Sequence, residues 1–267
     1  MDSDLKDKVA LVTGSSKGIG RSIAFALARE GCKVVVSARD SQLVDKTAAE
    51  IRKSNTGPAH GIAADVTVAA DVERLVSETI SHFATIHILV NNAGGIGRFG
   101  SFAELTDTEW TEIFNLNVLS AVRVTRAALP WMQKQKWGRI INISSESAVQ
   151  PDAWMPHYNA SKSALNNLTK SLSKAYGKEG ILVNTVSPAF IRTPLVDEML
   201  GEQARVRGIT VDEAEAAFLR ENRPNIVLGR SGDPDETAGI VVFLASKAAS
   251  FITGSNFRVD GGSVASV

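Results

Sequence analysis

The sequence predicts an α/β fold in which a doubly wound parallel sheet of about seven strands carries helices on both faces, a three-layer sandwich. Two observations support this prediction. Short runs rich in β-branched residues alternate with longer amphipathic stretches, which is the order of repeated β-α-β units. Several of the short runs are apolar at nearly every position, as expected for strands that are buried on both faces.

The predicted elements follow one another along the chain. Strands are expected at Val9–Thr13, Lys33–Ser37, Gly61–Ala64, Ile88–Asn91, Arg139–Ser144, Leu182–Val186 and Asn256–Val259. Helices are expected at Ile19–Glu30, Ser41–Lys53, Ala69–Phe83, Thr108–Gln133, Tyr158–Lys178 and Asp235–Ala245.

One stretch breaks the alternation. Residues 193–224, from Thr193 to Pro224, are helical in pattern and charged, and they follow the sixth strand. Ligands of open α/β sheets bind beyond the carboxyl ends of the strands, so an insert at this point is placed to act as a lid. We therefore expect residues 1–267 to form a single cofactor-binding catalytic domain with a helical substrate lid; the alternative is a solvated helical decoration.

Composition excludes several classes of function. The 267 residues include 29 basic and 29 acidic side chains, and this zero balance argues against a nucleic-acid or anionic-membrane partner. Cys32 is the only cysteine, which excludes an internal disulfide and a cysteine metal cluster, and we expect no metal. The N-terminus is polar and no apolar run approaches the ~18–20 residues of a membrane span. We expect a soluble, cytoplasmic protein.

A glycine-rich turn links the first predicted strand to the first helix. It reads Thr13-Gly14-Ser15-Ser16-Lys17-Gly18-Ile19-Gly20. Glycines at such a turn let the backbone approach a pyrophosphate group, whose charge then meets the N-terminus of the helix. Taken alone, the turn also fits a helix that merely packs closely on its strand. It is not a Walker loop, because no Gly-Lys-Ser/Thr follows.

Further short motifs follow this turn in a fixed order. They are Asp65, Asn91-Asn92-Ala93-Gly94, Asn117, Ser145, Tyr158-x-x-x-Lys162, Pro188 with Thr193, and Asp260-Gly261-Gly262. Together with the Thr-Gly-x-x-x-Gly-x-Gly turn they resemble the motifs of the short-chain dehydrogenase/reductase family, over residues 8–262. The resemblance implies a Rossmann fold, a nicotinamide nucleotide cofactor and a homotetramer (or homodimer) built on the two long helices and the C-terminal end.

The resemblance also implies a set of cofactor-binding residues. Asp65 is expected to bond the adenine, and Asn91 to stabilise the central strands beside the cofactor. Without the family, Asp65 fits a turn or an N-cap equally well. The full expected set is Gly14, Ser16, Lys17, Gly18, Ile19, Gly20, Arg39, Asp65, Val66, Asn91, Ala93, Gly94, Tyr158, Lys162, Pro188, Ala189, Ile191 and Thr193.

The end of the second strand bears on the choice between the two nicotinamide cofactors. An acidic residue there would bond the ribose 2′-hydroxyl of NAD, whereas a cation would receive the 2′-phosphate of NADP. Relatives that prefer NAD usually carry Asp at position 38, and this chain has Ala38 followed by Arg39, with Lys17 facing the same corner. Asp40 complicates the prediction, because it could cap the next helix or partly neutralise Arg39. We expect NADP(H), with NAD(H) possible.

The catalytic prediction depends on Tyr158 and Lys162. Four residues apart on a helix, the two side chains lie on one face. A phenol has a pKa near ~10, and a nearby ammonium group favours the phenolate, so Lys162 is expected to lower that pKa. Ser145, thirteen residues before Tyr158, can present its hydroxyl to the same carbonyl group.

The expected reaction is hydride transfer to a ketone carbon. Tyr158 donates a proton to the carbonyl oxygen, and Ser145 hydrogen-bonds that oxygen as charge develops. By resemblance Lys162 also bonds the nicotinamide ribose, and Asn117 holds a water that links Lys162 to solvent; a polar residue that kinks a long helix is the alternative for Asn117. The wider Tyr–Lys spacing of the enoyl reductases is absent, because positions 164 and 165 are Ala and Leu.

Three segments would line the substrate pocket: residues 95–102, 146–157 and 193–224. Apolar residues dominate them, so we expect a ketone or secondary alcohol with apolar surface, such as a 3-oxoacyl thioester. Arg98 or Arg192 could meet an acidic substrate instead. Where the family usually has Pro-Gly, this chain has Pro188-Ala189, and Ala tolerates a positive φ poorly. Two alternatives remain: an NAD-dependent dehydrogenase of a sugar, polyol or steroid hydroxyl, and a non-catalytic dinucleotide-binding scaffold.

Overall fold

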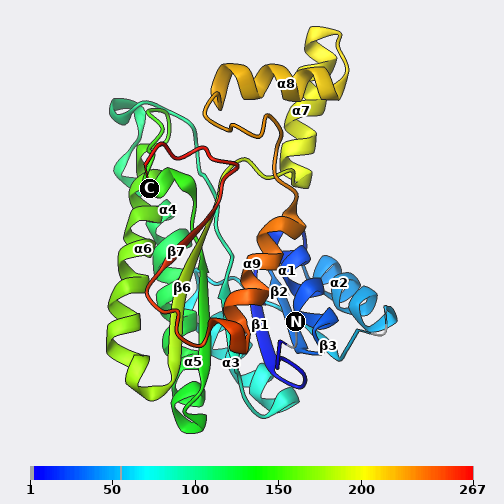
Figure 1. The fold of residues 1–267 in the computed structure, drawn as a ribbon, viewed down its shortest axis with the longest axis vertical. Coiled ribbons are helices and arrows are strands. Elements are labelled where there is room, and N and C mark those ends of the chain that lie inside the picture. Colours follow the sequence, from blue (N-terminus) through cyan, green and yellow to red (C-terminus); the bar gives the residue numbers. More distant parts are fainter. Residues whose placement is uncertain (1–2, 55, 267) are drawn as a thin grey trace.

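The computed structural model describes residues 3–54 and 56–266, and within them a single parallel sheet forms the centre of the molecule (Figure 1). Its strand order is β3-β2-β1-β4-β5-β6-β7, and every neighbouring pair is parallel. The strands are β1 (Val9–Thr13), β2 (Lys33–Ala38), β3 (Ala59–Ala63), β4 (Ile88–Asn91), β5 (Gly138–Ile143), β6 (Ile181–Pro188) and β7 (Asn256–Val259). This confirms the predicted doubly wound parallel sheet.

Helices cover both faces of the sheet because its strands are apolar on both sides. The helices are α1 (Gly18–Arg29), α2 (Ser41–Lys53), α3 (Ala69–Phe83), α4 (Asp107–Phe114), α5 (Ser120–Gln135), α6 (Pro156–Tyr176), α7 (Pro194–Arg207), α8 (Val211–Asn222) and α9 (Pro234–Ala245). Along β1, Ala10 and Val12 join one core cluster, with residues of α1, α2 and α9. Leu11 joins the other cluster, with residues of α3 and α5. The three-layer arrangement follows from this alternation.

The order of the strands creates a crevice between β1 and β4. From β1 the chain moves outward to β2 and β3, and it then returns to place β4 on the other side of β1. The loops that leave β1 and β4 therefore diverge at neighbouring carboxyl ends, which is where open α/β sheets bind ligands. The glycine-rich turn after Thr13 and the segment after Asn91 both lie at this point.

The predicted helix Thr108–Gln133 is interrupted. It consists of α4, a π-helical segment at Asn115–Leu119 and α5, and in the π segment the backbone hydrogen bonds span five residues instead of four. A π segment of this kind is frequent at functional sites, and Asn117 lies inside it.

The insert after β6 forms two helices, α7 and α8, that stand apart from the three layers (Figure 1). They are joined by a short turn at Gly208, which has a positive φ of 64°. Within the described residues, no helix is both long enough and apolar enough to cross a membrane.

Candidate active site

The glycine-rich turn is held in place by the segment that follows β4. Gly14 has a φ of +64°, a left-handed conformation that favours glycine. Asn92 Nδ2 donates hydrogen bonds to the carbonyl oxygens of Thr13 (2.9 Å) and Gly14 (3.0 Å). Thr13 Oγ1 in turn accepts from the backbone N–H groups of Asn92 and Ala93, each at 3.1 Å. These bonds fix the two loops of the crevice to each other.

The N-terminus of α1 is suited to an anionic group. No side chain caps its first turn, and that turn carries no acidic residue. The free N–H groups and the helix dipole therefore favour a phosphate, as the sequence predicts. At the other side of the turn, Thr193 packs against Gly18: a Cβ added to Gly18 would lie 3.3 Å from Thr193 Cγ2.

Two exposed cations lie at the start of α1 and the end of β2: Lys17 in the glycine-rich turn and Arg39 directly after β2. Among the described residues neither has a hydrogen-bonding or ion-pair partner on its side chain. Asp40, which could have neutralised Arg39, instead caps α2, where its carboxylate accepts from the Leu43 N–H at 3.1 Å. The glycine turn, the uncapped helix and the two cations together fit the diphosphate and 2′-phosphate of a nicotinamide dinucleotide phosphate.

The predicted catalytic hydroxyls meet at the carboxyl end of β5. Ser145 follows that strand, and its side chain is hydrogen-bonded to Tyr158 of α6. Ser145 Oγ also accepts from the Ser147 N–H at 3.2 Å, which fixes its orientation. Lys162 Nζ lies 5.7 Å from the centroid of the Tyr158 ring and donates to the Ile143 carbonyl oxygen at 2.9 Å.

The protonation of this trio differs from the prediction. Burial raises the pKa of Tyr158 above its ordinary value, and the hydrogen bond from Ser145 only partly opposes this. Lys162 does not contribute the expected lowering; its ammonium group lies 5.7 Å from the centroid of the Tyr158 ring and donates to the Ile143 carbonyl oxygen. Burial also lowers the pKa of Lys162 to about 8. In this state Tyr158 holds its proton at neutral pH, as an acid that donates to a carbonyl oxygen must.

Asn117 is buried and its side chain already has protein partners. Its amide group donates to the Gly95 carbonyl oxygen (2.9 Å) and to Ser161 Oγ (3.0 Å), and its carbonyl oxygen accepts from the Gly95 N–H (2.9 Å). A Cβ at Gly94 would lie 3.0 Å from Asn117 Oδ1 and 3.3 Å from Lys162 Nζ. The π segment thus brings Asn117 to the loop after β4 and to α6.

Other residues of the expected cofactor-binding set are held in place by hydrogen bonds or packing within the protein. Asn91 Nδ2 donates to Asn142 of β5 (2.8 Å) and Thr125 of α5 (3.1 Å), so it ties the two central strands to a helix. Asp65 Oδ1 accepts from the Thr67 N–H (2.9 Å) and hydroxyl (2.6 Å) in a turn. Val66 is buried in the core cluster that also contains residues of α3.

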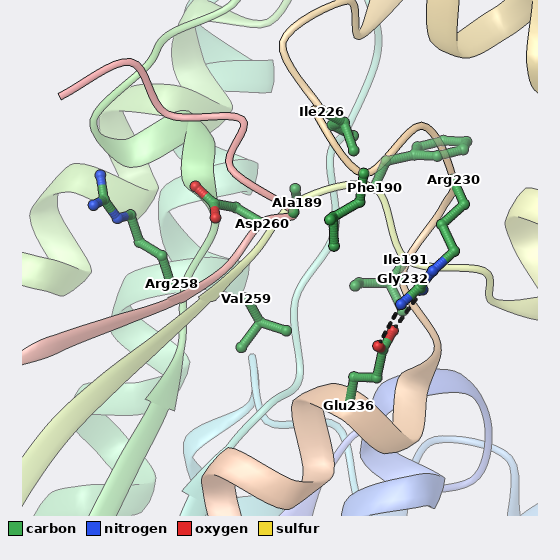
Figure 2. Close-up of a pocket in the computed structure, with 12 residues that line it drawn as sticks. Ala189, Phe190, Ile191, Ile226, Arg230, Gly232, Glu236, Arg258, Val259 and Asp260 are labelled. Atoms are coloured by element: carbon green, nitrogen blue, oxygen red, sulfur yellow. Dashed lines mark hydrogen bonds and ion pairs between the residues drawn. The ribbon is translucent and has the colours of Figure 1, made fainter. Parts of the chain in front are cut away.

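The segment after β6 borders a cavity of about 200 Å³, shown in Figure 2. Ala189 has no positive φ, so the strain expected from Ala in place of Gly is absent; its N–H donates to the Val259 carbonyl oxygen at 3.1 Å. Ile191 is buried and pairs with Gly232. Arg230 is held by Glu236 through two bonds of 2.9 Å and 2.7 Å, drawn dashed in Figure 2.

Neither arginine suggested for an acidic substrate is free. Arg98 is paired with Glu109, and Arg192 with Asp197 and Glu215. Each positive charge is therefore already balanced by a carboxylate, which makes these side chains poor anchors for a substrate anion.

Sequence reasoning missed Asn92, which joins the two loops of the crevice, although it stands inside the Asn91-Asn92-Ala93-Gly94 motif. It also missed Glu146 and Arg223, which lie near Tyr158. Adjacency to Ser145 was the only signal for Glu146, and no local pattern marks Arg223.

Comparison with known proteins agrees with this arrangement. Residues 14–264 match the family described as enoyl-(acyl carrier protein) reductase. The chain is 36% identical to the D-beta-hydroxybutyrate dehydrogenase of Cupriavidus necator, covering 98% of this chain and 99% of that one. It is 35% identical to the 3-oxoacyl-(acyl-carrier-protein) reductase of Aquifex aeolicus, with the same coverage.

Among solved structures, L-sorbose reductase from Gluconobacter frateurii, complexed with NADPH and L-sorbose, superposes with a TM-score of 0.95 at 34% identity and full coverage of both chains. These matches span nearly the whole sequence, including the crevice and the Ser145–Tyr158–Lys162 trio. The chain therefore belongs to the short-chain dehydrogenase/reductase family and is an oxidoreductase that acts on carbonyl and alcohol groups.

Proposed function

We propose that the protein is an NADP(H)-dependent reductase of ketones, and in the reverse direction a dehydrogenase of secondary alcohols, with Tyr158 as its proton donor. The observation that carries this proposal is the hydrogen-bonded pair Ser145–Tyr158 beside Lys162, at the carboxyl end of the central strands. The spacing of the catalytic motif supports reduction of a carbonyl rather than an enoyl group, because Lys162 follows Tyr158 by four residues and Ser145 is present.

The nicotinamide nucleotide supplies or accepts the hydride when it is bound. Tyr158 gives its proton to the carbonyl oxygen in reduction and takes the alcohol proton in oxidation. The Ser145 hydroxyl donates a hydrogen bond to the same oxygen, where negative charge develops. Lys162, with its pKa lowered to about 8, can return a proton toward Tyr158. The Asn117 side chain, which donates to Gly95 and Ser161, holds the π segment against the loop after β4 and against α6.

Two features support a preference for NADP(H). Arg39 and Lys17 carry charges without an ion-pair partner among the described residues, at the end of β2. There Ala38 stands where relatives that prefer NAD usually carry Asp. In support, the related L-sorbose reductase was crystallised with NADPH. Residues 193–224 are proposed as a lid over the substrate, since Thr193, the N-cap residue of α7, packs against Gly18 of the glycine turn.

Around the proposed substrate space, apolar side chains are exposed. Phe99, Trp154 and Leu195 are 60%, 62% and 68% exposed. They come from the three expected pocket segments, and they support a substrate with apolar surface, such as a 3-oxoacyl thioester. The related 3-oxoacyl reductase adds to this support. Family resemblance further supports a cytoplasmic homotetramer, which gel filtration would reveal as a species of four times the monomer mass.

The proposal is tested by following the absorbance of the reduced cofactor with a panel of ketones and alcohols, each with NADP(H) and NAD(H). We expect ketone reduction with a kcat/KM for NADPH at least tenfold above that for NADH, about the worth of one charge-assisted phosphate contact. Preference for NADH, or turnover of enoyl but not keto substrates, would contradict the proposal.

A further inference from the structure

An arginine at the end of the lid reaches the loop between the two catalytic hydroxyls. Arg223 directly follows α8, and its backbone N–H donates to the Leu219 carbonyl oxygen at 2.9 Å, so the end of that helix fixes the point from which its side chain extends. Arg223 Nη1 donates to Asp152 Oδ2 at 3.0 Å. Asp152 lies in the loop that leads from Ser145 to Tyr158. The lid and the catalytic loop are therefore joined by an ion pair.

Within the catalytic loop, Asp152 is connected to the helix that carries Tyr158. Asp152 Oδ1 accepts a hydrogen bond from the Trp154 N–H at 2.9 Å, and the Asp152 backbone carbonyl oxygen accepts from Asn159 Nδ2 at 2.6 Å. Asn159 is only 4% exposed and follows Tyr158 directly in the first turn of α6. A displacement of Asp152 would therefore also displace the turn that holds the catalytic tyrosine.

On the lid side, α8 is fastened to the segments that connect the lid to the sheet. Phe218 of α8 stacks on Phe190, with ring centroids 4.7 Å apart. Glu215 of α8 accepts a hydrogen bond from the Ser231 N–H at 3.0 Å. Because both contacts hold α8 against these segments, the helix moves together with them, and Arg223 moves with the helix.

The ion pair is partly shielded from water and acts close to the reacting phenol. The side chains of Arg223 and Asp152 are only 24% and 25% exposed, so their attraction is screened less than that of a surface pair. Arg223 Nε also lies 3.9 Å from Glu146 Oε1. The charge of Glu146 raises the pKa of Tyr158, and the charge of Arg223 lowers it. The lid thus supplies a positive charge that opposes Glu146 beside the phenol.

We propose that Arg223 is a positioning residue: through its ion pair with Asp152 it fixes the loop that joins the two catalytic hydroxyls, so that their alignment depends on the position of the lid. The inference rests on the proposed function and goes beyond it, because it gives the lid a part in aligning the reacting groups as well as in covering the substrate. A lid that moves away withdraws Arg223 and leaves the loop without this support, which confines rapid turnover to the closed lid.

A double-mutant cycle tests the inference. It compares the wild type, Arg223→Gln, Asp152→Asn and the double variant, with Arg220→Gln as the control. Reduction of the panel ketone that the wild type turns over fastest gives kcat and KM, and fluorescence titration gives the NADPH affinity. Arg220 is exposed on the same helix, three residues before Arg223, and its side chain makes no hydrogen bond or ion pair with the described residues.

We expect kcat to fall about tenfold in each single variant, the usual worth of a hydrogen bond between charged groups. KM should change little, because the pair acts on alignment rather than on binding. The double variant should be no slower than the single variants, since all three lack the same ion pair. Arg220→Gln should keep the wild-type kcat, and NADPH affinity should stay within about twofold in every variant.

The pH profile of alcohol oxidation separates positioning from a general structural role. Oxidation needs deprotonated Tyr158 as the base, so the rate rises with pH. Loss of the Arg223 charge leaves Glu146 unopposed and raises the pKa of Tyr158 further. The profile of Arg223→Gln should therefore lie at higher pH than those of the wild type and Arg220→Gln. Lys162, with its pKa of about 8, is present in all of these proteins and contributes equally to each profile.

Four results would overturn the inference alone. They are a wild-type kcat in Arg223→Gln, losses that multiply in the double variant, an unshifted pH profile in Arg223→Gln, and a loss of NADPH binding together with turnover, which would indicate a general structural role. Failure of the wild type to reduce any ketone of the panel would overturn the proposed function and this inference with it.

Discussion

Substitution of Gly20 by Ala tests how tightly the cofactor crevice is built. Gly20 is buried in the first turn of α1, and a Cβ there would lie 2.3 Å from Asn92 Nδ2 and 2.4 Å from the Gly14 carbonyl oxygen. Both distances are far below van der Waals contact, and the Gly14 oxygen belongs to the backbone. The methyl group therefore displaces Asn92 from its bonds to the Thr13 and Gly14 carbonyl oxygens.

The cost follows from these contacts. Overpacking a tight site costs about 1–3 kcal/mol, and each lost hydrogen bond about 0.5–1.5 kcal/mol. We expect Gly20→Ala to lower the free energy of unfolding by about 3 kcal/mol, which lowers the Tm by roughly 6–12 °C for a chain of this size. Because the glycine turn moves, NADPH affinity should fall by at least about tenfold, a change of about 1.4 kcal/mol.

Thermal unfolding followed by circular dichroism measures the stability, and fluorescence titration measures NADPH binding. Gly239→Ala is the matched control: Gly239 lies inside α9, and a Cβ there meets no atom within 4 Å. That variant should gain about 0.5–1 kcal/mol, since Gly is unfavourable in a helix interior. An unchanged Tm and unchanged NADPH affinity in Gly20→Ala would refute the proposed packing of the crevice.

Three other outcomes are expected. Arg39→Ala should weaken NADPH binding about tenfold and leave NADH binding unchanged, because only the 2′-phosphate meets the guanidinium; equal effects in titrations of both cofactors would contradict this. Burial lowers the pKa of His87 to about 4, so from pH 6.5 down to 4 the unfolded chain binds a proton that the folded chain does not. The free energy of unfolding, measured with urea, should therefore be at its full value above pH 6.5 and fall by up to about 3 kcal/mol toward pH 4. In His87→Gln most of this pH dependence should disappear. A pH dependence equal to that of the wild type would exclude His87 as its source. Thr169 accepts hydrogen bonds from Asn142 and Thr185, each at 2.8 Å. Thr169→Val should therefore lower the free energy of unfolding by about 2–4 kcal/mol. A loss under about 0.5 kcal/mol in the same assay would show that this buried network contributes little to stability.

The sequence predicts the sheet well because the central strands are apolar on both faces and lie between turn residues. Val9–Thr13, Ile88–Asn91 and Asn256–Val259 have the predicted bounds, whereas the third strand begins at Ala59, two residues earlier than expected. His60 explains the error, since a polar residue hid the start of an edge strand.

Tertiary contacts determine what the sequence could not predict. The π segment around Asn117 depends on bonds to Gly95 and Ser161, which are distant in the chain. The raised pKa of Tyr158 depends on burial rather than on its spacing to Lys162. Arg223 reaches the catalytic loop only through the folding of the lid. Local periodicity carries no information about such pairs.

The most direct test of the central claim is single-turnover reduction of a ketone by NADPH in the wild type and in Tyr158→Phe, with NADPH affinity measured in parallel. Phenylalanine keeps the ring over which Lys162 lies but removes the hydroxyl that bonds Ser145. Loss of the general acid is expected to slow the reaction by about 10²–10⁴-fold, while NADPH affinity stays within a few-fold of the wild-type value. Hydride transfer at a near wild-type rate in Tyr158→Phe would contradict the assignment of Tyr158 as the proton donor.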